Sequence, residues 1–133
     1  MFLGHPLTKI SARVADVFEA GTNSIIYLKL KNSKTGENCE TLALDTEGNN
    51  WWRGYQETYE DSTMLAPCGS FYPTRVNNLK FNFREEITWQ SMGTSNDLIL
   101  TEVTLHFGPD LSFTWRGRHT FNIANSNSWL SLK

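Results

Sequence analysis

The chain has 133 residues, a length that fits one domain with a single hydrophobic core. Its 12 Lys and Arg residues face 14 Asp and Glu residues, so the formal net charge is -2 and no stretch concentrates enough cation for a nucleic-acid partner. Hydrophobic residues make up 39% and aromatic residues 13%, which argues against a disordered chain and indicates a mainly β protein.

The first ten residues lack a basic start followed by a long apolar run, so no secretory signal is visible in them. No window approaches 18 consecutive apolar residues, so we expect no transmembrane segment and place any membrane contact at the surface, as in a peripheral or extracellular protein. Cys39 and Cys68 are too few for a disulfide framework and lack the spacing of a zinc site. One bridge between them and two free thiols both fit the sequence.

Short alternating or β-branched runs recur along the chain, separated by clusters of Gly, Asn, Asp and Pro. This pattern predicts an all-β sandwich or barrel with little helix. The expected strands cover residues 10–18, 25–30, 39–44, 55–59, 79–83, 98–107, 111–115 and 119–123. We expect residues 1–9 to form an N-terminal tail and residues 10–133 to form one domain.

Alternation within these strands also predicts the core, because successive side chains of a strand point to opposite faces. In the strand at 79–83, Leu79, Phe81 and Phe83 share the inward face. The full set expected between the sheets is Leu28, Leu30, Leu42, Leu44, Trp51, Leu79, Phe81, Phe83 and Val103.

The sequence offers no obvious catalytic constellation. It contains no HExxH, GxSxG, phosphate-binding glycine loop or paired CxxC motif. His5, His106 and His119 fall in the N-terminal tail or in expected strands, where a structural role is the usual one. We therefore expect no catalytic residues in this chain.

Three loop segments, at residues 19–23, 45–50 and 93–97, are rich in glycine and oxygen-bearing side chains. Calcium takes six to eight oxygen ligands from carboxylates, amides and backbone carbonyls, and these loops offer all three kinds. Ordinary turns stabilised by Asn and Asp side chains explain the same composition. Both readings stay open on spacing alone.

Trp51 and Trp52 are neighbours, and in an extended chain neighbouring side chains point opposite ways. Only one of them can then enter the core. The other indole, beside Arg53, would lie exposed as a contact for lipid or ligand, or flat against a neighbouring loop.

Two blocks of the sequence carry a family pattern. The first is AGTNSIIYLKL at residues 20–30, and the second is LDTEGNNWWRG at residues 44–54, followed by Glu57, Thr58 and Tyr59. In order and spacing they are similar to the motifs A-G-T-D-x-x-V-Y-L-x-L and L-D-N-x-x-N-x-F-x-R-G-x-x-D-x-F of PLAT domains, the family of polycystin, lipoxygenase and alpha-toxin. The resemblance extends over roughly residues 10–132.

Within this family the chain most resembles the C-terminal membrane-binding domain of clostridial phospholipase C toxins. The resemblance implies a non-catalytic, antiparallel two-sheet sandwich that meets a phospholipid membrane surface or a protein partner through loops at one end. Trp51 takes the buried aromatic position of the motif. Trp52 and Arg53 are then the expected contacts with the membrane or partner.

The resemblance also implies two calcium sites. Their ligands would be Glu19, the Gly21 carbonyl and Asn96 or Asp97 in the first, and Asp45, the Thr46 and Gly48 carbonyls and Asn50 in the second. Compared with the toxin motifs, Asn23 and Asn50 each replace an aspartate and remove a negative charge, which weakens calcium binding. We therefore expect weak sites that fill only at high calcium.

A second class of function remains open: a calcium-independent module that binds proteins or carbohydrates. In that case Trp52, Tyr55 and Trp89 would form a stacking platform. The dependence of binding on calcium separates this class from the first.

Overall fold

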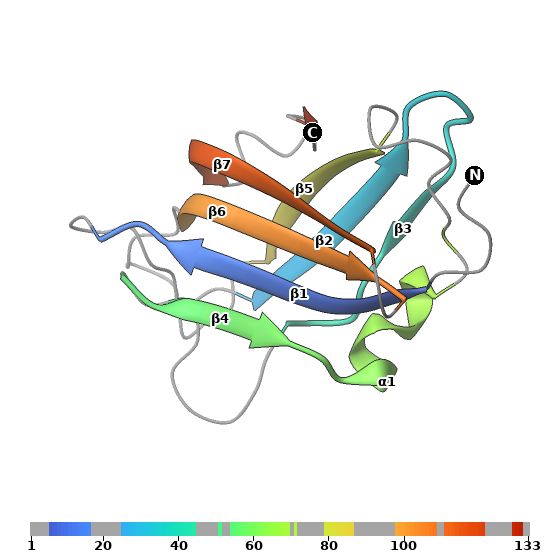
Figure 1. The fold of residues 1–133 in the computed structure, drawn as a ribbon, viewed down its shortest axis with the longest axis horizontal. Coiled ribbons are helices and arrows are strands. Elements are labelled where there is room, and N and C mark those ends of the chain that lie inside the picture. Colours follow the sequence, from blue (N-terminus) through green and yellow to red (C-terminus); the bar gives the residue numbers. More distant parts are fainter. Residues whose placement is uncertain are drawn as a thin grey trace.

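The structure, a computed structural model, describes residues 6–16, 25–44, 51, 54–69, 71, 79–86, 98–108, 111–121 and 129–131. Its strands form two four-stranded sheets, of order β4-β1-β6-β7 and β3-β2-β5-β8, and all their pairings are antiparallel. The two sheets lie one in front of the other in Figure 1. The all-β sandwich expected from the sequence is confirmed.

The first sheet consists of β1 (Leu7–Val14), β4 (Gln56–Tyr59), β6 (Leu98–Phe107) and β7 (Leu111–Phe121). The second consists of β2 (Ile25–Asn32), β3 (Asn38–Glu40), β5 (Leu79–Glu86) and β8 (Leu130–Ser131). A helical turn α1 (Ser62–Leu65) and a 3-10 turn η1 (Ala66–Cys68) follow β4. Both are far too short to cross a bilayer, and no helix in the described part of the chain is long and apolar enough to do so.

β7 differs most from the expected strands. Two strands are predicted at 111–115 and 119–123, but a single strand runs through the polar stretch around Gly117. The pairing moves from Leu100 with His119 to Glu102 with Arg116, so β7 has an extra residue there. Such a bulge keeps the ladder continuous where the alternation of the sequence breaks. The first strand likewise begins at Leu7, before the expected start at residue 10.

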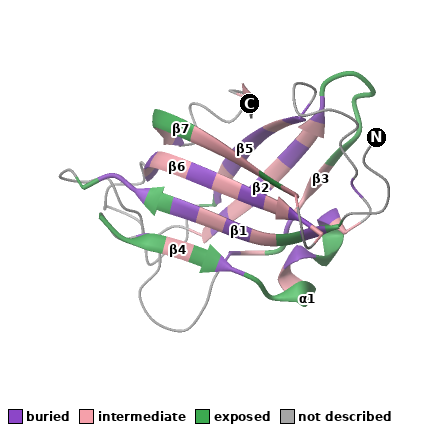
Figure 2. Ribbon diagram, viewed as in Figure 1, coloured by how far each residue is buried: buried purple, intermediate pink, exposed green. Residues whose placement is uncertain are grey.

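The core lies between the two sheets, where buried positions alternate along the strands (Figure 2). All of the predicted core residues are buried except Leu42, which is 49% exposed, so that prediction is wrong. The reason is that β3 ends at Glu40, and the alternation does not continue past it. Thr41 is buried instead, and Leu42 N donates to the carbonyl of Met64 in α1.

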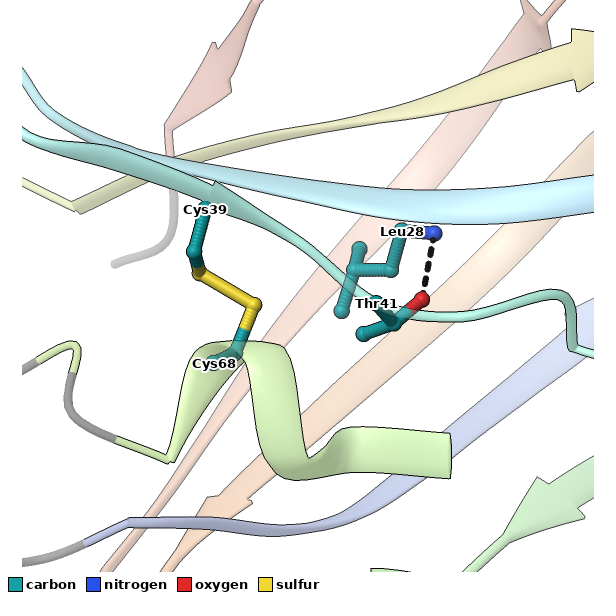
Figure 3. Close-up of a disulfide and its surroundings, with 4 residues drawn as sticks. All are labelled: Leu28, Cys39, Thr41 and Cys68. Carbon is teal, nitrogen blue, oxygen red and sulfur yellow. Dashed lines mark hydrogen bonds between the residues drawn. A yellow bond between two sulfur atoms is a disulfide. The ribbon is translucent and has the colours of Figure 1, made fainter. Parts of the chain in front are cut away.

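Beyond the end of β3, a hydrogen bond to the Thr41 side chain takes the place of a backbone ladder bond with β2. The backbone N of Thr41 donates to the Leu28 carbonyl at 2.9 Å. Its Oγ1 accepts from Leu28 N at 3.1 Å, the bond drawn in Figure 3. The two bonds leave this buried stretch of β2 satisfied without a longer β3.

A disulfide joins Cys39 in β3 to Cys68 in η1, with the two Cα atoms 5.4 Å apart (Figure 3). Of the two alternatives open in the sequence, the structure therefore has the bridge. Asp61 caps α1 by accepting from Thr63 N and Met64 N, which fixes the start of the turn that leads into η1 and Cys68. The bridge ties an edge strand of the second sheet to the segment that leaves the first sheet.

Candidate loop-end site

The predicted ligands and contacts lie outside the described residues. They are Glu19, Gly21, Asp45, Thr46, Gly48, Asn50, Trp52, Arg53, Asn96 and Asp97. Their roles remain predictions. What the structure provides is the frame on which these residues are carried.

The strand ends that border these segments meet at one end of the sandwich. In the first sheet, the end of β1 pairs with the starts of β4 and β6, and Phe121 at the end of β7 pairs with Leu98. In the second sheet, Ile25 at the start of β2 pairs with Glu86 at the end of β5. The bordering ends of the first sheet lie at the left in Figure 1. Segments 17–24, 45–50 and 87–97 therefore all start and finish at this end, which we call the loop end.

Trp51 holds the second motif in place. Its side chain is only 2% exposed, stacks on Tyr59 of the first sheet at 5.5 Å between ring centroids, and meets Phe83 of the second sheet edge-on at 5.9 Å. Its Nε1 donates to the Leu44 carbonyl at 3.3 Å, and Leu44 N donates to the Ile26 carbonyl at 2.8 Å. The two residues that flank segment 45–50 are thus joined to each other and to β2.

The burial of Trp51 is confirmed, but the geometric reason behind it is different from the expected one. The alternation argument assumes an extended chain, whereas Trp51 has a φ of 62° and is the one non-glycine residue with positive φ in the described part of the chain. Such a conformation costs on the order of 1–3 kcal/mol and is found where the surroundings enforce it, often at functional sites. Here the indole contacts and hydrogen bonds provide that enforcement.

Gly54 returns the chain to β1. Its N donates to the carbonyls of Val14 and Ala15 at 3.1 and 3.2 Å, and its φ of 76° suits glycine. A Cβ at this position would stand 3.3 Å from Asp16 Oδ1. Gly54 therefore permits a close approach between the end of the second motif and the Asp16 carboxylate.

Asp16 and Glu57 are two carboxylates at the loop end that were not among the predicted calcium ligands. Asp16 falls within the strand expected at 10–18, but β1 ends at Val14 and leaves Asp16 at the loop end. Glu57 Oε1 accepts from Trp51 N at 3.2 Å. Burial raises the pKa of Glu57, and the hydrogen bond from Trp51 lowers it in part. Glu57 takes the aspartate position of the second motif, whereas Asp16 lies outside both motif blocks.

The oxygen-rich character of the predicted donors suits calcium, since carboxylate, amide and carbonyl oxygens are its preferred ligands. In the described ranges, no group of three or more His, Cys, Asp or Glu side chains gathers as a metal site.

His106 and His119 lie in β6 and β7, as expected. Burial lowers the pKa of each imidazole, with Lys9 adding to the effect on His106. The His119 ring stands edge-on to Phe121 at 4.7 Å between centroids. Both surroundings fit residues that pack within a sheet.

Comparison with solved structures extends these observations. An alpha toxin from Clostridium absonum matches 98% of this chain with a TM-score of 0.61 and 21% identity. A lipoxygenase variant matches 98% with a TM-score of 0.65 and 14% identity, and a coral 8R-lipoxygenase, described as calcium-activated through a C2-like domain, matches 86% with a TM-score of 0.58 and 14% identity. A scan against protein-family models and a search of curated proteins gave no match.

The chain spans 32% of the toxin and 16% and 15% of the two lipoxygenases. The shared part is thus a portion of each larger protein. These likenesses establish the fold, which matches the C-terminal domain of the clostridial toxin and the PLAT domains of the lipoxygenases. By fold, this chain is a PLAT-type β-sandwich.

Proposed function

We propose that this chain is a non-catalytic domain that attaches reversibly to a phospholipid membrane surface through its loop end, assisted by calcium. The observation that carries the proposal is the meeting of the loop-bearing strand ends at one end, with the flanks of segment 45–50 joined by Trp51 and Leu44. A loop whose ends are fixed loses less conformational entropy when it binds.

Calcium would be held by the two donor sets around Asp45 and around Glu19. When bound, it would neutralise loop carboxylates and bridge them to anionic headgroups. The chain's own residues would supply the rest: Trp52 would enter the headgroup region, and Arg53 would meet phosphate oxygens. The similarity of fold to a calcium-activated lipoxygenase supports this choice of cation.

The expected binding energy is modest. A buried aromatic side chain contributes about 1.5–3 kcal/mol, and one or two such anchors with a weak cation bridge give reversible attachment. A surface domain of this kind would localise a larger protein or partner without inserting permanently.

Co-sedimentation with phosphatidylserine-containing vesicles tests the proposal, with and without millimolar calcium. The wild-type chain should pellet with vesicles in calcium and stay in the supernatant in chelator. Trp52→Ala should reduce the bound fraction while leaving the melting temperature nearly unchanged. Trp129→Leu serves as the matched control, because residue 129 precedes β8, whose pairing with β5 at Lys80 and Phe81 lies away from the loop end.

Equal binding with and without calcium would remove the calcium part of the proposal and favour a calcium-independent module. Loss of vesicle binding by Trp129→Leu, with Trp52→Ala unaffected, would place the membrane contact on another face.

A further inference from the structure

The outer face of the second sheet carries four cations. Lys29 and Lys31 of β2, and Lys80 and Arg84 of β5, occupy alternate positions on this face. They account for four of the 12 Lys and Arg residues in a chain of net charge -2. The strands of the first sheet also carry four cations, Lys9, Arg13, Arg116 and Arg118, so what distinguishes the second sheet is how its cations are grouped.

Near the loop end, carboxylates offset this charge. Arg84 makes two bonds of 2.9 Å to the Glu40 carboxylate, from Nε and Nη2, and lies 4.0 Å from the centroid of the Tyr27 ring. Tyr27 in turn donates its hydroxyl to Glu86 at 2.7 Å. These four residues combine one cation with two carboxylates, so their formal net charge is -1.

Toward the other end, Glu40 stands opposite Lys29 in the β2–β3 ladder but is bonded to Arg84. The Lys29 and Lys31 ammonium groups lie 5.1 and 5.5 Å from the ring centroid of Trp129, and Lys80 Nζ donates to Ser131 Oγ at 2.8 Å. Within the described part of the chain, none of the three lysines forms an ion pair with a carboxylate. We call Lys29, Lys31 and Lys80 the lysine cluster.

The strand register places two of these lysines opposite each other. Lys31 and Lys80 are direct partners across the β2–β5 ladder, and like charges in that position destabilise a sheet. Lys29 lies two residues, roughly 7 Å, along the strand from Lys31. Trp129 holds the first two ammonium groups by cation–π attraction, so the charges are positioned before any ligand arrives.

The surroundings favour one class of anionic ligand. Protein interfaces are depleted in lysine and built around apolar cores, whereas this cluster has three lysines and one aromatic ring. The lysine cluster also lies away from a membrane that meets the loop end. Its Lys31–Lys80 pair is next to Asn32–Leu79, the last pair of the β2–β5 ladder. The loop end is at the opposite pair, Ile25–Glu86.

The disulfide indicates the compartment in which the protein acts. Bridges such as Cys39–Cys68 persist in oxidising, extracytoplasmic surroundings. Among the polyanions of the outside, sulfated sugar chains carry permanent charges at close spacing, and clusters of basic residues are suited to them.

We propose that the lysine cluster binds a sulfated polysaccharide on the outer face of the second sheet. Lys29, Lys31 and Lys80 contact the sulfate groups, and Trp129 acts as a positioning residue for the first two. This binding is independent of calcium and of the loop end.

The test measures binding of fluorescently labelled heparin in calcium-free buffer at low salt. The wild-type chain should bind, and added sodium chloride should weaken the binding because the contacts are ionic. The triple variant Lys29→Gln, Lys31→Gln, Lys80→Gln should lose at least about tenfold in affinity, or ~1.4 kcal/mol. Its melting temperature should stay equal or rise, because a like-charge pair is removed.

A variant with the same change in charge is the control. Lys9→Gln, Arg13→Gln, Arg118→Gln removes three cations from β1 and β7 of the other sheet, and should bind heparin within about twofold of wild type. Equal loss in both variants would overturn the proposal in favour of general charge attraction. Tighter binding of phosphatidylserine vesicles or duplex DNA at the same lysines would overturn it in favour of a lipid or nucleic-acid surface. Failure of the wild type to bind heparin at low salt would also refute it.

Discussion

Trp51 shows how a single residue can organise a site. It combines a buried ring, a backbone conformation rare for non-glycine residues, and two hydrogen bonds that link Leu44 to Glu57 through the indole and its own amide. Tyr59 and Phe83, one on each sheet, hold the ring from both sides of the core. The stability of the sandwich and the closure of segment 45–50 therefore depend on the same side chain.

Replacing Trp51 should separate these two contributions. Trp51→Ala should lower the free energy of unfolding by about 3–5 kcal/mol, because it leaves a large cavity. Trp51→Phe keeps a ring but removes the bond to the Leu44 carbonyl, so we expect a loss of about 1 kcal/mol from that bond, with some further loss from reduced packing. Urea unfolding followed by circular dichroism measures both.

Trp52→Ala is the comparison for this series, with an expected change within about 0.5 kcal/mol, as for a surface residue. The opposite ranking, with Trp52→Ala unfolding the chain and Trp51→Ala mild, would contradict the assignment of Trp52 as the exposed anchor.

The burial of Trp51 could be predicted from the sequence, but its conformation could not. A positive φ leaves no trace in a pattern of apolar and polar residues, because it results from tertiary contacts with Tyr59, Phe83 and Leu44. The same applies to Asp16, whose place at the loop end follows from where β1 stops. Alternation predicts which face a side chain takes, and not where the strand ends.

At the level of elements, strands with strict alternation were predicted well. β5 and β6 coincide with the expected strands at 79–83 and 98–107, with β5 extended to Glu86. The bounds of β3 and β7 differ from the expected ones. At β3, the Thr41 hydroxyl takes over a ladder bond, and in β7 a bulge carries the ladder past Gly117. Hydroxyl substitution and bulges are local solutions that binary patterning does not encode.

The disulfide is the element-level feature with the largest expected effect on stability. It joins residues 29 apart in sequence, and the closed segment includes β4, α1 and residues 45–53. A cross-link over a loop of this size contributes about 3–4 kcal/mol. Cys39→Ala, Cys68→Ala should therefore lower the melting temperature by roughly 10 °C.

Reduction provides the control for this variant. A reducing agent should lower the melting temperature of the wild type by a similar amount and leave the double variant unchanged. Two free thiols in the native protein by mass spectrometry, with no response to the reducing agent, would contradict the bridge.

At the scale of the whole molecule, the two proposed contacts use different parts of one sandwich. The loop end gathers the segments expected to hold calcium, and the lysine cluster lies near the other end of the second sheet. Loop-end variants should therefore leave heparin binding intact, and cluster variants should leave vesicle binding intact, because distant sites act additively. The two proposals can thus fail separately.

Calcium binding should be detectable in the stability of the whole fold. A ligand that binds only the native state stabilises it by mass action, and at about ten times a millimolar Kd the gain is about 1.4 kcal/mol. We therefore expect several millimolar calcium to raise the melting temperature by a few degrees, which scanning fluorimetry would resolve. Asp45→Ala should abolish the rise, because it removes the aspartate carboxylate of the second donor set.

Asp61→Ala provides the control for this measurement. Asp61 caps α1 through bonds to Thr63 N and Met64 N, so its loss should lower the melting temperature by removing about 1 kcal/mol of capping. The rise on adding calcium should persist in this variant, since α1 lies outside the predicted donor sets. Should calcium leave the wild-type melting temperature unchanged, the oxygen-rich loops are plain turns, and any membrane attachment must rest on Trp52 and Arg53 alone.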